Sequence, residues 1–376
     1  MSAFPCRCWV EVSRSQIAAN FRNVRAVVGP NVEVMGVVKA DAYGHGAVEV
    51  SRVLESEGAA WLAVSNAGEG VALRRGGITA RILVMADFLP FERDALHQYD
   101  LTPVIHSLSH LAELDRIANS GGVPLRYHLK IDSGMGRLGT RAGAGEILAA
   151  VRGARRARLE GLMTHFASSA SYTSTQTDGQ IEAFERVLGG LRREGVEPAW
   201  VHLSSTNPVA YGRARAWGNI VRVGHALYGY VSPVRGVAPR KILSVLPALS
   251  WKAAVLAVKD VPEGALIGYG GIFRAPRPMK IAVLAVGYAD GFPHRLSNRG
   301  KVIAAGEFAP ILGAVSMDLT TIDITRAPHL QPGDTVTLLG REAGISQDAQ
   351  QIARLAGTIS YSVLCGISAR VKRVYV

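Results

Sequence analysis

The sequence predicts an α/β fold, a (β/α)₈ barrel of the TIM type followed by a mainly β C-terminal domain. Two observations predict it. Eight short strand-like runs alternate with helical stretches over the first two thirds of the chain, and after about Pro239 the pattern changes to strands and turns without long helices. The alternation indicates parallel strands joined by crossover helices. Eight such units favour a closed barrel, because an open doubly wound sheet usually has about six.

The eight runs are mostly apolar, rich in β-branched residues and short enough to be single strands. A helix precedes them, predicted by apolar residues that recur at helical spacing at Ile17, Phe21, Val24 and Val28. In chain order the runs are Val32–Val38, Ala60–Val64, Arg81–Met85, Leu101–Ile105, Leu125–Ile131, Leu159–His165, Trp200–Leu203 and Ile220–Val223.

The β-rich remainder predicts a second, mainly antiparallel domain. We therefore divide the chain into a barrel over residues 1–240 and a β domain over 241–376, with the boundary between Tyr230 and Leu246. The apolar strand Cys8–Val12 could pair with either domain. The runs of the β domain are Leu249–Val258, Ile281–Val286, Val302–Ala304, Thr320–Ile324, Thr335–Leu339 and Arg370–Val376.

Composition is that of an ordinary globular protein. The 376 residues are 48% hydrophobic, enough for a large core. The net charge of +12 comes from dispersed basic residues, so we expect no nucleic-acid partner. No run approaches the ~20 apolar residues of a membrane span, and no signal-peptide core precedes the barrel, so we expect a cytoplasmic protein without a membrane partner. Three scattered cysteines suit neither a disulfide framework nor a metal site, and we expect no metal.

Lys39 stands directly after the first predicted barrel strand, in the stretch VVKADAYGHG at residues 37–46. Active groups of a barrel lie at the carboxyl ends of its strands. An amine at the end of an apolar strand is partly desolvated, which lowers its proton affinity and makes it a candidate nucleophile for a Schiff base with an aldehyde. The same lysine could instead pair with a carboxylate such as Asp41, and its position alone leaves both interpretations open.

Further distinctive segments follow in a fixed order. They are Lys130–Gly139, Thr164–Ala167, Arg222–Gly229, Gly268–Gly271, Gly287–Gly291, Ser316–Asp318 and Tyr361–Cys365. In order and spacing along almost the whole chain, this set resembles the alanine racemase family, whose members depend on pyridoxal 5′-phosphate (PLP). Residues 37–46 resemble the family's PLP-lysine signature.

The resemblance implies racemisation of L-alanine and D-alanine by two bases, a reaction that supplies D-alanine. Lys39 would hold PLP covalently and exchange the substrate α-proton on one face, and Tyr269 would exchange it on the other. In the family the lysine serves the D enantiomer and the tyrosine the L enantiomer. A free phenol has a pKa near ~10, so nearby positive charge must lower the pKa of Tyr269 before it can act as a base.

The resemblance also assigns cofactor and substrate contacts. Arg222 would face the ring nitrogen of PLP, and His165 would stack beside the ring. The phosphate would meet Tyr43, Thr206, Tyr361 and amides near Gly224. The substrate would meet Arg137, Met317 and Tyr288, and Lys130 corresponds to a lysine that is often carbamylated in the family.

The family pattern further implies a homodimer with shared active sites, because Tyr269 and Met317 reach the partner's cofactor. We expect supporting roles for His45 and His202, whose spacing does not match a metal triad.

Two positions depart from the pattern. Ala170 and Ala314 replace an acidic residue and an arginine that commonly line the substrate entrance. A broader-specificity racemase that accepts serine or larger side chains is therefore an alternative. A non-catalytic PLP carrier would lack the second domain and the tyrosine base, and a PLP-barrel decarboxylase would need a signature cysteine and an acidic loop that are not evident.

Overall fold

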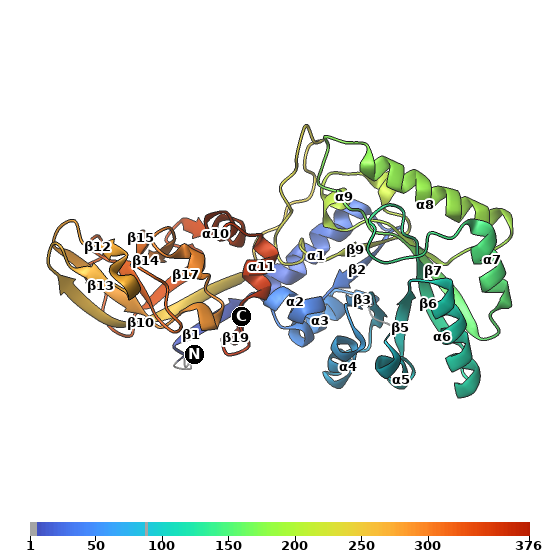
Figure 1. Cartoon of the computed structure of the whole chain (residues 1–376), viewed down its shortest axis with the longest axis horizontal. Helices are drawn as coiled ribbons and strands as arrows, with labels where there is room; N and C mark the ends of the chain where they lie inside the picture. Colours follow the sequence, from blue (N-terminus) through green and yellow to red (C-terminus); the bar gives the residue numbers. More distant parts are fainter. Residues whose placement is uncertain (1–5, 87–88) are drawn as a thin grey trace. The chain divides into compact units, whose positions relative to one another are not determined.

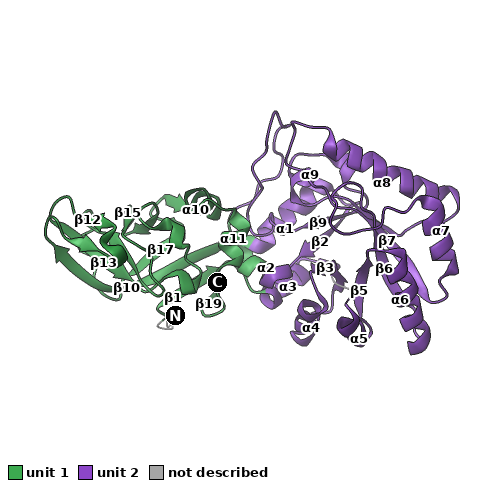
Figure 2. Cartoon of the chain, in the orientation of Figure 1, with its two compact units in different colours: residues 1–16, 43–46, 247–376 green, residues 17–42, 47–246 purple. Residues whose placement is uncertain are grey.

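The computed structural model describes residues 6–86 and 89–376 of the chain (Figure 1). These residues fall into two compact units. Residues 17–42 and 47–246 form one, which we call the barrel unit. Residues 43–46 and 247–376, with the described part of residues 1–16, form the other, the β unit (Figure 2). The β unit is thus built from three separate stretches of sequence.

The barrel unit contains a parallel sheet of eight strands in the order β8-β7-β6-β5-β4-β3-β2-β9. Two backbone hydrogen bonds connect the two edges: the amide of Asn219 donates to the carbonyl of Val201 (3.1 Å), and the amide of Arg222 donates to that of Ser204 (3.2 Å). The sheet is thereby nearly closed, which confirms the predicted TIM-type fold. The strands are β2 (Glu33–Val37), β3 (Trp61–Val64), β4 (Arg81–Val84), β5 (Leu101–Ile105), β6 (Leu125–Lys130), β7 (Ala157–Met163), β8 (Trp200–His202) and β9 (Ile220–Val223).

Helices connect successive strands of this sheet (Figure 1). Every residue of β3 and β9 is buried, because strands of a parallel sheet are covered on both faces. No described helix is long and apolar enough to cross a lipid bilayer. The helices are α1 (Arg14–Val28), α2 (Lys39–Gly44), α3 (Ala47–Ser56), α4 (Ala67–Arg75), α5 (Arg93–Gln98), α6 (Leu108–Gly121), α7 (Ala144–Gly153), α8 (Gln176–Arg193) and α9 (Thr206–Ala210), with 3₁₀ turns at Pro90–Glu92 and Ala214–Ala216.

The β unit is built on a nine-stranded sheet in the order β18-β17-β14-β15-β16-β13-β10-β1-β19. All its strand pairs are antiparallel except β1 with β19. Because β10 also pairs with β17, the strands from β17 to β10 close on themselves. The strands are β1 (Cys8–Val12), β10 (Leu249–Val261), β13 (Met279–Leu284), β14 (Lys301–Ala304), β15 (Glu307–Leu312), β16 (Thr320–Asp323), β17 (Thr335–Glu342), β18 (Ile345–Gln347) and β19 (Lys372–Tyr375).

Short elements complete the β unit. They are a two-stranded ribbon of β11 (Leu266–Ile267) and β12 (Phe273–Arg274), helices α10 (Ala349–Ala356) and α11 (Ser360–Cys365), and 3₁₀ turns at Tyr269–Gly271, Tyr288–Asp290 and His294–Leu296.

The structure also shows where the first strand belongs. β1 pairs with β10 and with β19, so this N-terminal strand is part of the β unit. After the barrel, the chain enters the β unit at Pro247. The sequence-based division at residue 240 stays a prediction of the domain organisation.

Candidate active site

Predicted site residues of the barrel unit stand at the carboxyl ends of strands. Lys39 opens α2 directly after β2, Lys130 is the last residue of β6, and His165 follows β7. Thr206 opens α9 after β8, and Gly224 follows β9. Since the carboxyl ends of parallel barrel strands form one rim, these residues belong to a single end of the barrel.

The turn after Lys39 has a left-handed backbone. The residues Ala40–Tyr43 have φ angles of +52°, +51°, +53° and +54°. A left-handed conformation costs a residue other than glycine about 1–2 kcal/mol, so this turn stores strain. Hydrogen bonds hold it: Glu69 accepts from the first amide of the turn (2.7 Å), and Asp41 accepts from the amide of Ala47 (2.7 Å). The Asp41 carboxylate therefore supports the backbone beside the lysine.

Arg222 is the most constrained cation of the rim, with 3% of its surface exposed. Its Nη1 lies 2.8 Å from Nδ1 of His202 and donates to the carbonyl of the same residue (2.9 Å). Its Nη2 donates to the carbonyls of Thr164 (2.7 Å) and Leu203 (3.0 Å) and lies 3.2 Å from Nδ1 of His165. Burial lowers the pKa of Arg222 to about 9, so the guanidinium is charged at neutral pH.

Burial, together with crowded positive charge, shifts the pKa of two further groups. Burial, followed by Arg222 and Lys130, lowers the pKa of His165 well below its usual range, so this imidazole is neutral at pH 7. Burial, followed by Arg222 and Arg137, lowers the pKa of Lys130 to about 8. The charge of Lys39 adds to both shifts, so all these groups lie within electrostatic reach of one another.

The loop that carries Arg137 is organised around Asp132. One carboxylate oxygen of Asp132 accepts hydrogen bonds from the amides of Gly134 (3.2 Å), Met135 (3.0 Å) and Gly136 (2.9 Å). Its other oxygen accepts from a side chain just beyond the loop, Nε of Arg141 (2.8 Å). Arg137 is exposed at the tip of this loop.

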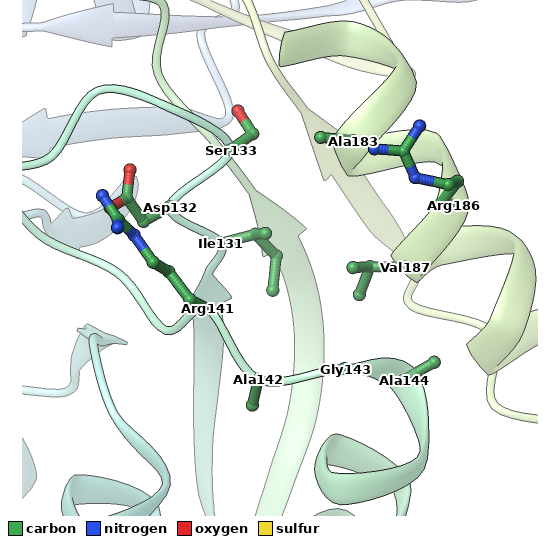
Figure 3. Close-up of a pocket in the computed structure, with 10 residues that line it drawn as sticks. All are labelled: Ile131, Asp132, Ser133, Arg141, Ala142, Gly143, Ala144, Ala183, Arg186 and Val187. Carbon is green, nitrogen blue, oxygen red and sulfur yellow. The ribbon is translucent and has the colours of Figure 1, made fainter. Parts of the chain in front are cut away.

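A cavity of about 420 Å³ lies between this loop and α8 (Figure 3). Arg141 and Arg186 line it from opposite sides, and the ion pair of Arg141 with Asp132 partly neutralises its charge. None of the predicted site residues lines it. We therefore place the candidate active site at the rim and not in this cavity.

Hydroxyl and amide groups gather after β8 and β9. The Thr206 hydroxyl accepts a hydrogen bond from the amide of Ala226 (3.2 Å), which links the start of α9 to the segment after β9. The Ser204 hydroxyl is fully buried and has no hydrogen-bond partner among the described residues. The Tyr228 hydroxyl donates to the carbonyl of Val37 (2.8 Å), two residues before the lysine. The hydroxyls of Ser204 and Thr206 therefore retain donors for an anionic group, whereas that of Tyr228 is already used.

The remaining predicted residues belong to the β unit. Tyr43 is buried, and the centre of its ring lies 5.9 Å from that of Tyr361 in α11. Burial, with a smaller contribution from Tyr361, raises the pKa of Tyr43, which keeps its phenol protonated as a hydrogen-bond donor. Tyr269 is 77% exposed and sits in a turn in which Gly268 and Gly270 have φ angles of +75° and +68°. Those angles explain the glycine-rich sequence around the tyrosine.

Tyr288 and Met317 lie on two loops that are joined to each other. The amide of Tyr288 donates to the carbonyl of Ser316 (2.9 Å), and the amide of Ala289 donates to that of Met317 (3.0 Å). Tyr288 and Met317 are 46% and 54% exposed, so both side chains face outward from the β unit.

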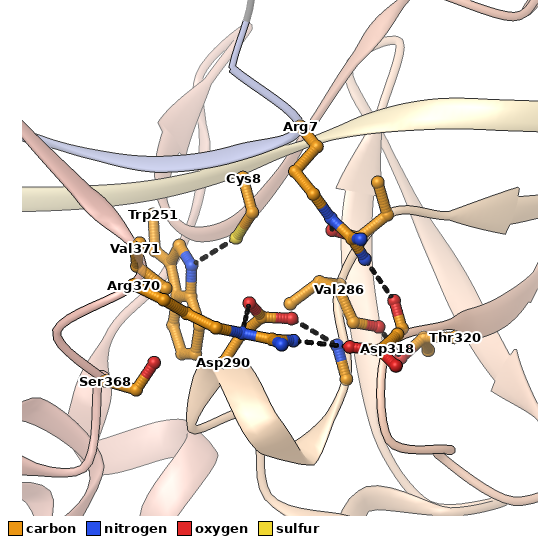
Figure 4. A network of polar contacts seen from close by, with 12 residues as sticks. Arg7, Cys8, Trp251, Val286, Asp290, Asp318, Thr320, Ser368, Arg370 and Val371 are labelled. Carbon is orange, nitrogen blue, oxygen red and sulfur yellow. Dashed lines mark hydrogen bonds and ion pairs between the residues drawn. The ribbon is translucent and has the colours of Figure 1, made fainter.

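An ion-pair network fixes the same two loops (Figure 4). Arg370 donates from Nε to Asp290 (2.7 Å) and from Nη2 to Asp318 (2.7 Å), and so connects the loop of Tyr288 with that of Met317. Asp290 is buried and accepts a second bond from the amide of Gly287 (2.9 Å). Arg7, next to β1, donates to the carbonyl of Asp318 (2.7 Å).

Comparison with known proteins gives one consistent result. The family model "Alanine racemase, N-terminal domain" matches residues 12–233, and "Alanine racemase, C-terminal domain" matches residues 248–375. The alanine racemase of Halothermothrix orenii is 39% identical over 369 residues, which are 98% of this chain and 96% of that protein. The chain belongs to the alanine racemase family. This membership makes it an isomerase and confirms the family inferred from the sequence motifs.

Solved alanine racemases have the same fold. The enzyme from Clostridium difficile 630 superposes with a TM-score of 0.92 at 32% identity, covering 100% of this chain and 97% of the other. The enzyme from Bartonella henselae, solved with covalently bound pyridoxal phosphate, superposes with a TM-score of 0.86 at 26% identity, covering 99% and 100%.

The alanine racemase family is PLP-dependent, and the rim of this chain suits such a group. Nη1 and Nη2 of Arg222 donate to protein acceptors, whereas its Nε donates to none of the described residues. The buried Ser204 hydroxyl likewise has no described partner, although the sequence analysis did not single it out. Ser204 stands directly before Ser205-Thr206, and this closeness in sequence to a predicted phosphate contact is the signal that could have identified it. These donors match an aromatic nitrogen and a phosphate.

The structure places Lys39, Lys130, Arg137 and His165 within electrostatic reach of Arg222. Within the β unit it joins Tyr43 to Tyr361 and the loop of Tyr288 to that of Met317. The assignment of Tyr269 as the partner base of Lys39 stays a prediction. Sequence reasoning also missed two residues beyond Arg222, the buried His128 and the partly exposed Glu160, because neither stands at a strand end.

Proposed function

We propose that this chain racemises alanine with PLP as its cofactor and Lys39 and Tyr269 as its two bases, and that the reaction supplies D-alanine. The observation that carries the proposal is the rim itself, where Lys39, Lys130 and His165 surround a buried arginine in a chain that matches alanine racemases over nearly its whole length. Family members are generally dimeric and cytoplasmic, and we extend both properties to this protein.

The residues that the family resemblance assigns would hold the cofactor by complementary chemistry. Tyr43, Thr206, Tyr361 and the amides near Gly224 supply neutral donors to a phosphate. His165 supplies a flat, neutral imidazole to pack beside a ring.

Arg222 supplies a cation that keeps its own protons, since its pKa stays above neutral pH. It would therefore donate a hydrogen bond to the ring nitrogen without protonating it, which would make the ring a weaker electron sink.

When bound, PLP withdraws electrons from the bond between the substrate α-carbon and its hydrogen. The protein has to supply one base on each face of that carbon. Nζ of Lys39 removes or returns the proton on the face of the D enantiomer, and the phenolic oxygen of Tyr269 does so on the face of the L enantiomer. Arg137, Tyr288 and the amide of Met317 hold the substrate carboxylate, so the α-carbon keeps its place while the proton changes sides.

The test follows exchange of the α-proton in deuterated water, starting from each pure enantiomer. We expect Tyr269→Phe to slow exchange from L-alanine by about 10²–10⁴-fold, the contribution of one general base, and to slow exchange from D-alanine far less. Lys39→Ala should lose both PLP attachment and racemisation. Tyr99→Phe removes a phenol elsewhere and serves as the control. An equal loss from both enantiomers in Tyr269→Phe would contradict the two-base assignment.

A second candidate function, racemisation of longer amino acids, is favoured by the two alanines at the expected entrance positions. Replacing a carboxylate and a guanidinium together leaves no unpaired charge and widens the entrance channel. Discrimination against one extra methylene in a pocket is worth only ~1–3 kcal/mol, so a wider entrance could remove part of it. We compare kcat/KM for alanine and serine in the natural chain and in the double variant Ala170→Asp with Ala314→Arg. A double variant that is no more selective for alanine would eliminate this candidate.

A further inference from the structure

A row of polar side chains extends from Arg222 through two buried histidines to the partly exposed Glu160. Nη1 of Arg222 lies 2.8 Å from Nδ1 of His202, and Nε2 of His202 lies 2.7 Å from Nδ1 of His128. Nε2 of His128 then faces Oε2 of Glu160 at 3.6 Å, and the same oxygen accepts a hydrogen bond from Arg81 (2.6 Å). Both histidines are fully buried.

Hydrogen-bond direction along this row follows from its two ends. Arg222 has only donors, so Nδ1 of His202 must accept and the proton of that ring must be on Nε2. That proton is donated to Nδ1 of His128, which leaves the proton of the second ring on Nε2, where the Glu160 carboxylate attracts it electrostatically across 3.6 Å, just beyond hydrogen-bond distance. A carboxylate has only acceptors, so the row begins at a cation and ends at an anion without conflict.

The protonation states agree with this arrangement. Burial is the largest cause that lowers the pKa of both His202 and His128, so each ring is neutral at pH 7 and carries a single proton. Burial alone would raise the pKa of Glu160, but His128 and Arg81 lower it to about 2, so the carboxylate is ionised.

The local backbone makes room for this row. Gly161 follows Glu160 on β7, and a Cβ atom at Gly161 would lie only 2.5 Å from Nδ1 of His128. The pairing of β6 with β7 also shifts register between Tyr127 and His128. The ring of His128 is further packed 5.3 Å from that of Trp61. Packing therefore holds the imidazole in one place, and its polar neighbours decide which ring nitrogen carries the proton.

We propose that Glu160 is a positioning residue for Arg222: acting through His128, it fixes the proton of His202 on Nε2 and thereby the orientation of the guanidinium. The inference deepens the proposed function and rests on it, since it assumes that Arg222 faces PLP. Without the carboxylate at position 160, the Nε2 proton of His128 loses the anion that attracts it across 3.6 Å, and the opposite tautomers gain population. In those tautomers Nδ1 of His202 carries a proton that points at Arg222, which must then turn away.

Two substitutions distinguish the effect of losing the acceptor from the effect of changing the side-chain volume. Glu160→Met removes the acceptor and keeps a similar volume. Glu160→Gln keeps an acceptor, because the donor of Arg81 at 2.6 Å selects the amide oxygen for the Oε2 position. Glu185, which also pairs with an arginine but lies on the exposed surface of α8, provides the matched control Glu185→Met.

The first measurement is the tautomer of His202 and His128 in the full chain, by NMR of ¹⁵N-labelled histidine in the absence of substrate. We expect protons on Nε2 of both rings in the natural protein and in Glu160→Gln, and a measurable Nδ1-protonated population in Glu160→Met. A natural protein with His202 protonated on Nδ1 would overturn the proposal, whether or not any variant folds.

The second measurement is the apparent dissociation constant for PLP, titrated into protein stripped of cofactor. We expect this dissociation constant to rise about tenfold in Glu160→Met, because a guanidinium of Arg222 that has turned away loses about one charge-assisted hydrogen bond to PLP. In Glu160→Gln and Glu185→Met it should stay within about twofold. Equal defects in the two Glu160 variants, or none in Glu160→Met, would refute the role of the acceptor. A natural protein that binds no PLP would refute the proposed function instead, while the tautomers would still decide the proton arrangement.

Discussion

At the residue scale, the rim is rich in cations. Lys39, Lys130, Arg137 and Arg222 lower the pKa of their neighbours by mutual repulsion and burial. A site with unbalanced positive charge attracts anions, here the phosphate of a cofactor and the carboxylate of an amino acid. Burial and these neighbouring cations together lower the pKa of Lys130 and so give it a more reactive amine.

Lys130 is predicted to take up carbon dioxide as a carbamate. The neutral amine attacks the carbon of CO₂, a nitrogen–carbon bond forms, and the nitrogen loses a proton to solvent. With a pKa of about 8, roughly a tenth of the amine is neutral at pH 7, whereas for an ordinary lysine the neutral fraction is below about a thousandth. The product is an anion that Arg137 and Arg222 would stabilise.

We expect a ¹³C NMR carbamate signal when the protein is equilibrated with ¹³C-labelled carbon dioxide. At equal dissolved CO₂, the signal should grow as the pH rises from 6 toward the pKa of Lys130 and level off above it, because only the deprotonated amine reacts. Lys130→Arg should abolish the signal, and Lys252→Arg, on the surface, should leave it unchanged. A signal that survives Lys130→Arg would assign the carbamate to another lysine.

Single residues also show how far the sequence is informative. Lys39 could be singled out because it directly follows an apolar strand, and Arg222 because its segment resembles a family motif. His128 and Glu160 could not, since their proximity depends on the register between β6 and β7 and on the absence of a side chain at Gly161. No spacing in one sequence reports that register.

At the element scale, the left-handed turn after Lys39 is predicted to reduce stability. Ala40 is exposed and has φ +52°, a conformation that glycine adopts at no steric cost. Ala40→Gly should therefore raise the free energy of unfolding by roughly 0.5–1 kcal/mol, because relief of about 1–2 kcal/mol of strain exceeds the added entropy of the unfolded chain.

Urea denaturation measures this effect, and the matched control has the opposite sign. Ala149 is exposed within α7, where a change to glycine should lower stability by about 1 kcal/mol. If Ala40→Gly were as destabilising as Ala149→Gly, the turn would not be strained as its dihedral angles indicate.

A second element-scale prediction concerns Arg370, which connects the loops of Tyr288 and Met317. Arg370→Met should raise KM for alanine about tenfold with a smaller change in kcat, because loosened loops weaken substrate binding by about one charge-assisted hydrogen bond. It should also lower Tm, since Asp290 is left as a buried carboxylate without its ion-pair partner.

The double variant Arg370→Met with Asp290→Asn separates the two effects. Removing the buried charge should recover much of the lost Tm, while KM stays high because the loops remain unconnected. Recovery of both together would mean that the single variant acted only through stability.

Whole elements were predictable in the barrel to within about two residues, because parallel strands buried on both faces are continuous apolar runs. The β unit was harder. The run that became β15 contains Pro310, which interrupts the usual strand pattern, and its pairing with β16 begins only at Ile311. Helices α10 and α11 are only 8 and 6 residues long, too short for a clear periodic pattern.

At the scale of the whole molecule, the exposure of the proposed tyrosine base bears on assembly. Tyr269, Tyr288 and Met317 are exposed on the β unit by 77%, 46% and 54%. A general base works best where water is excluded, so a tyrosine in this role needs a covering surface. The family pattern supplies one, because in it this tyrosine and methionine complete the partner's site. We therefore predict a homodimer with two composite sites.

Mixed dimers test this prediction. Lys39→Ala and Tyr269→Ala chains are each inactive alone, but a dimer that contains one of each has one site with both bases intact and one site with neither. Random exchange makes about half of the dimers mixed, and half of their sites intact, so racemisation should recover to about a quarter of the natural activity. Mixing Lys39→Ala with Lys39→Arg chains leaves no site with both bases and should recover nothing. If exchange is verified by mass and the first mixture stays inactive, Lys39 and Tyr269 act within one chain and the composite site is wrong.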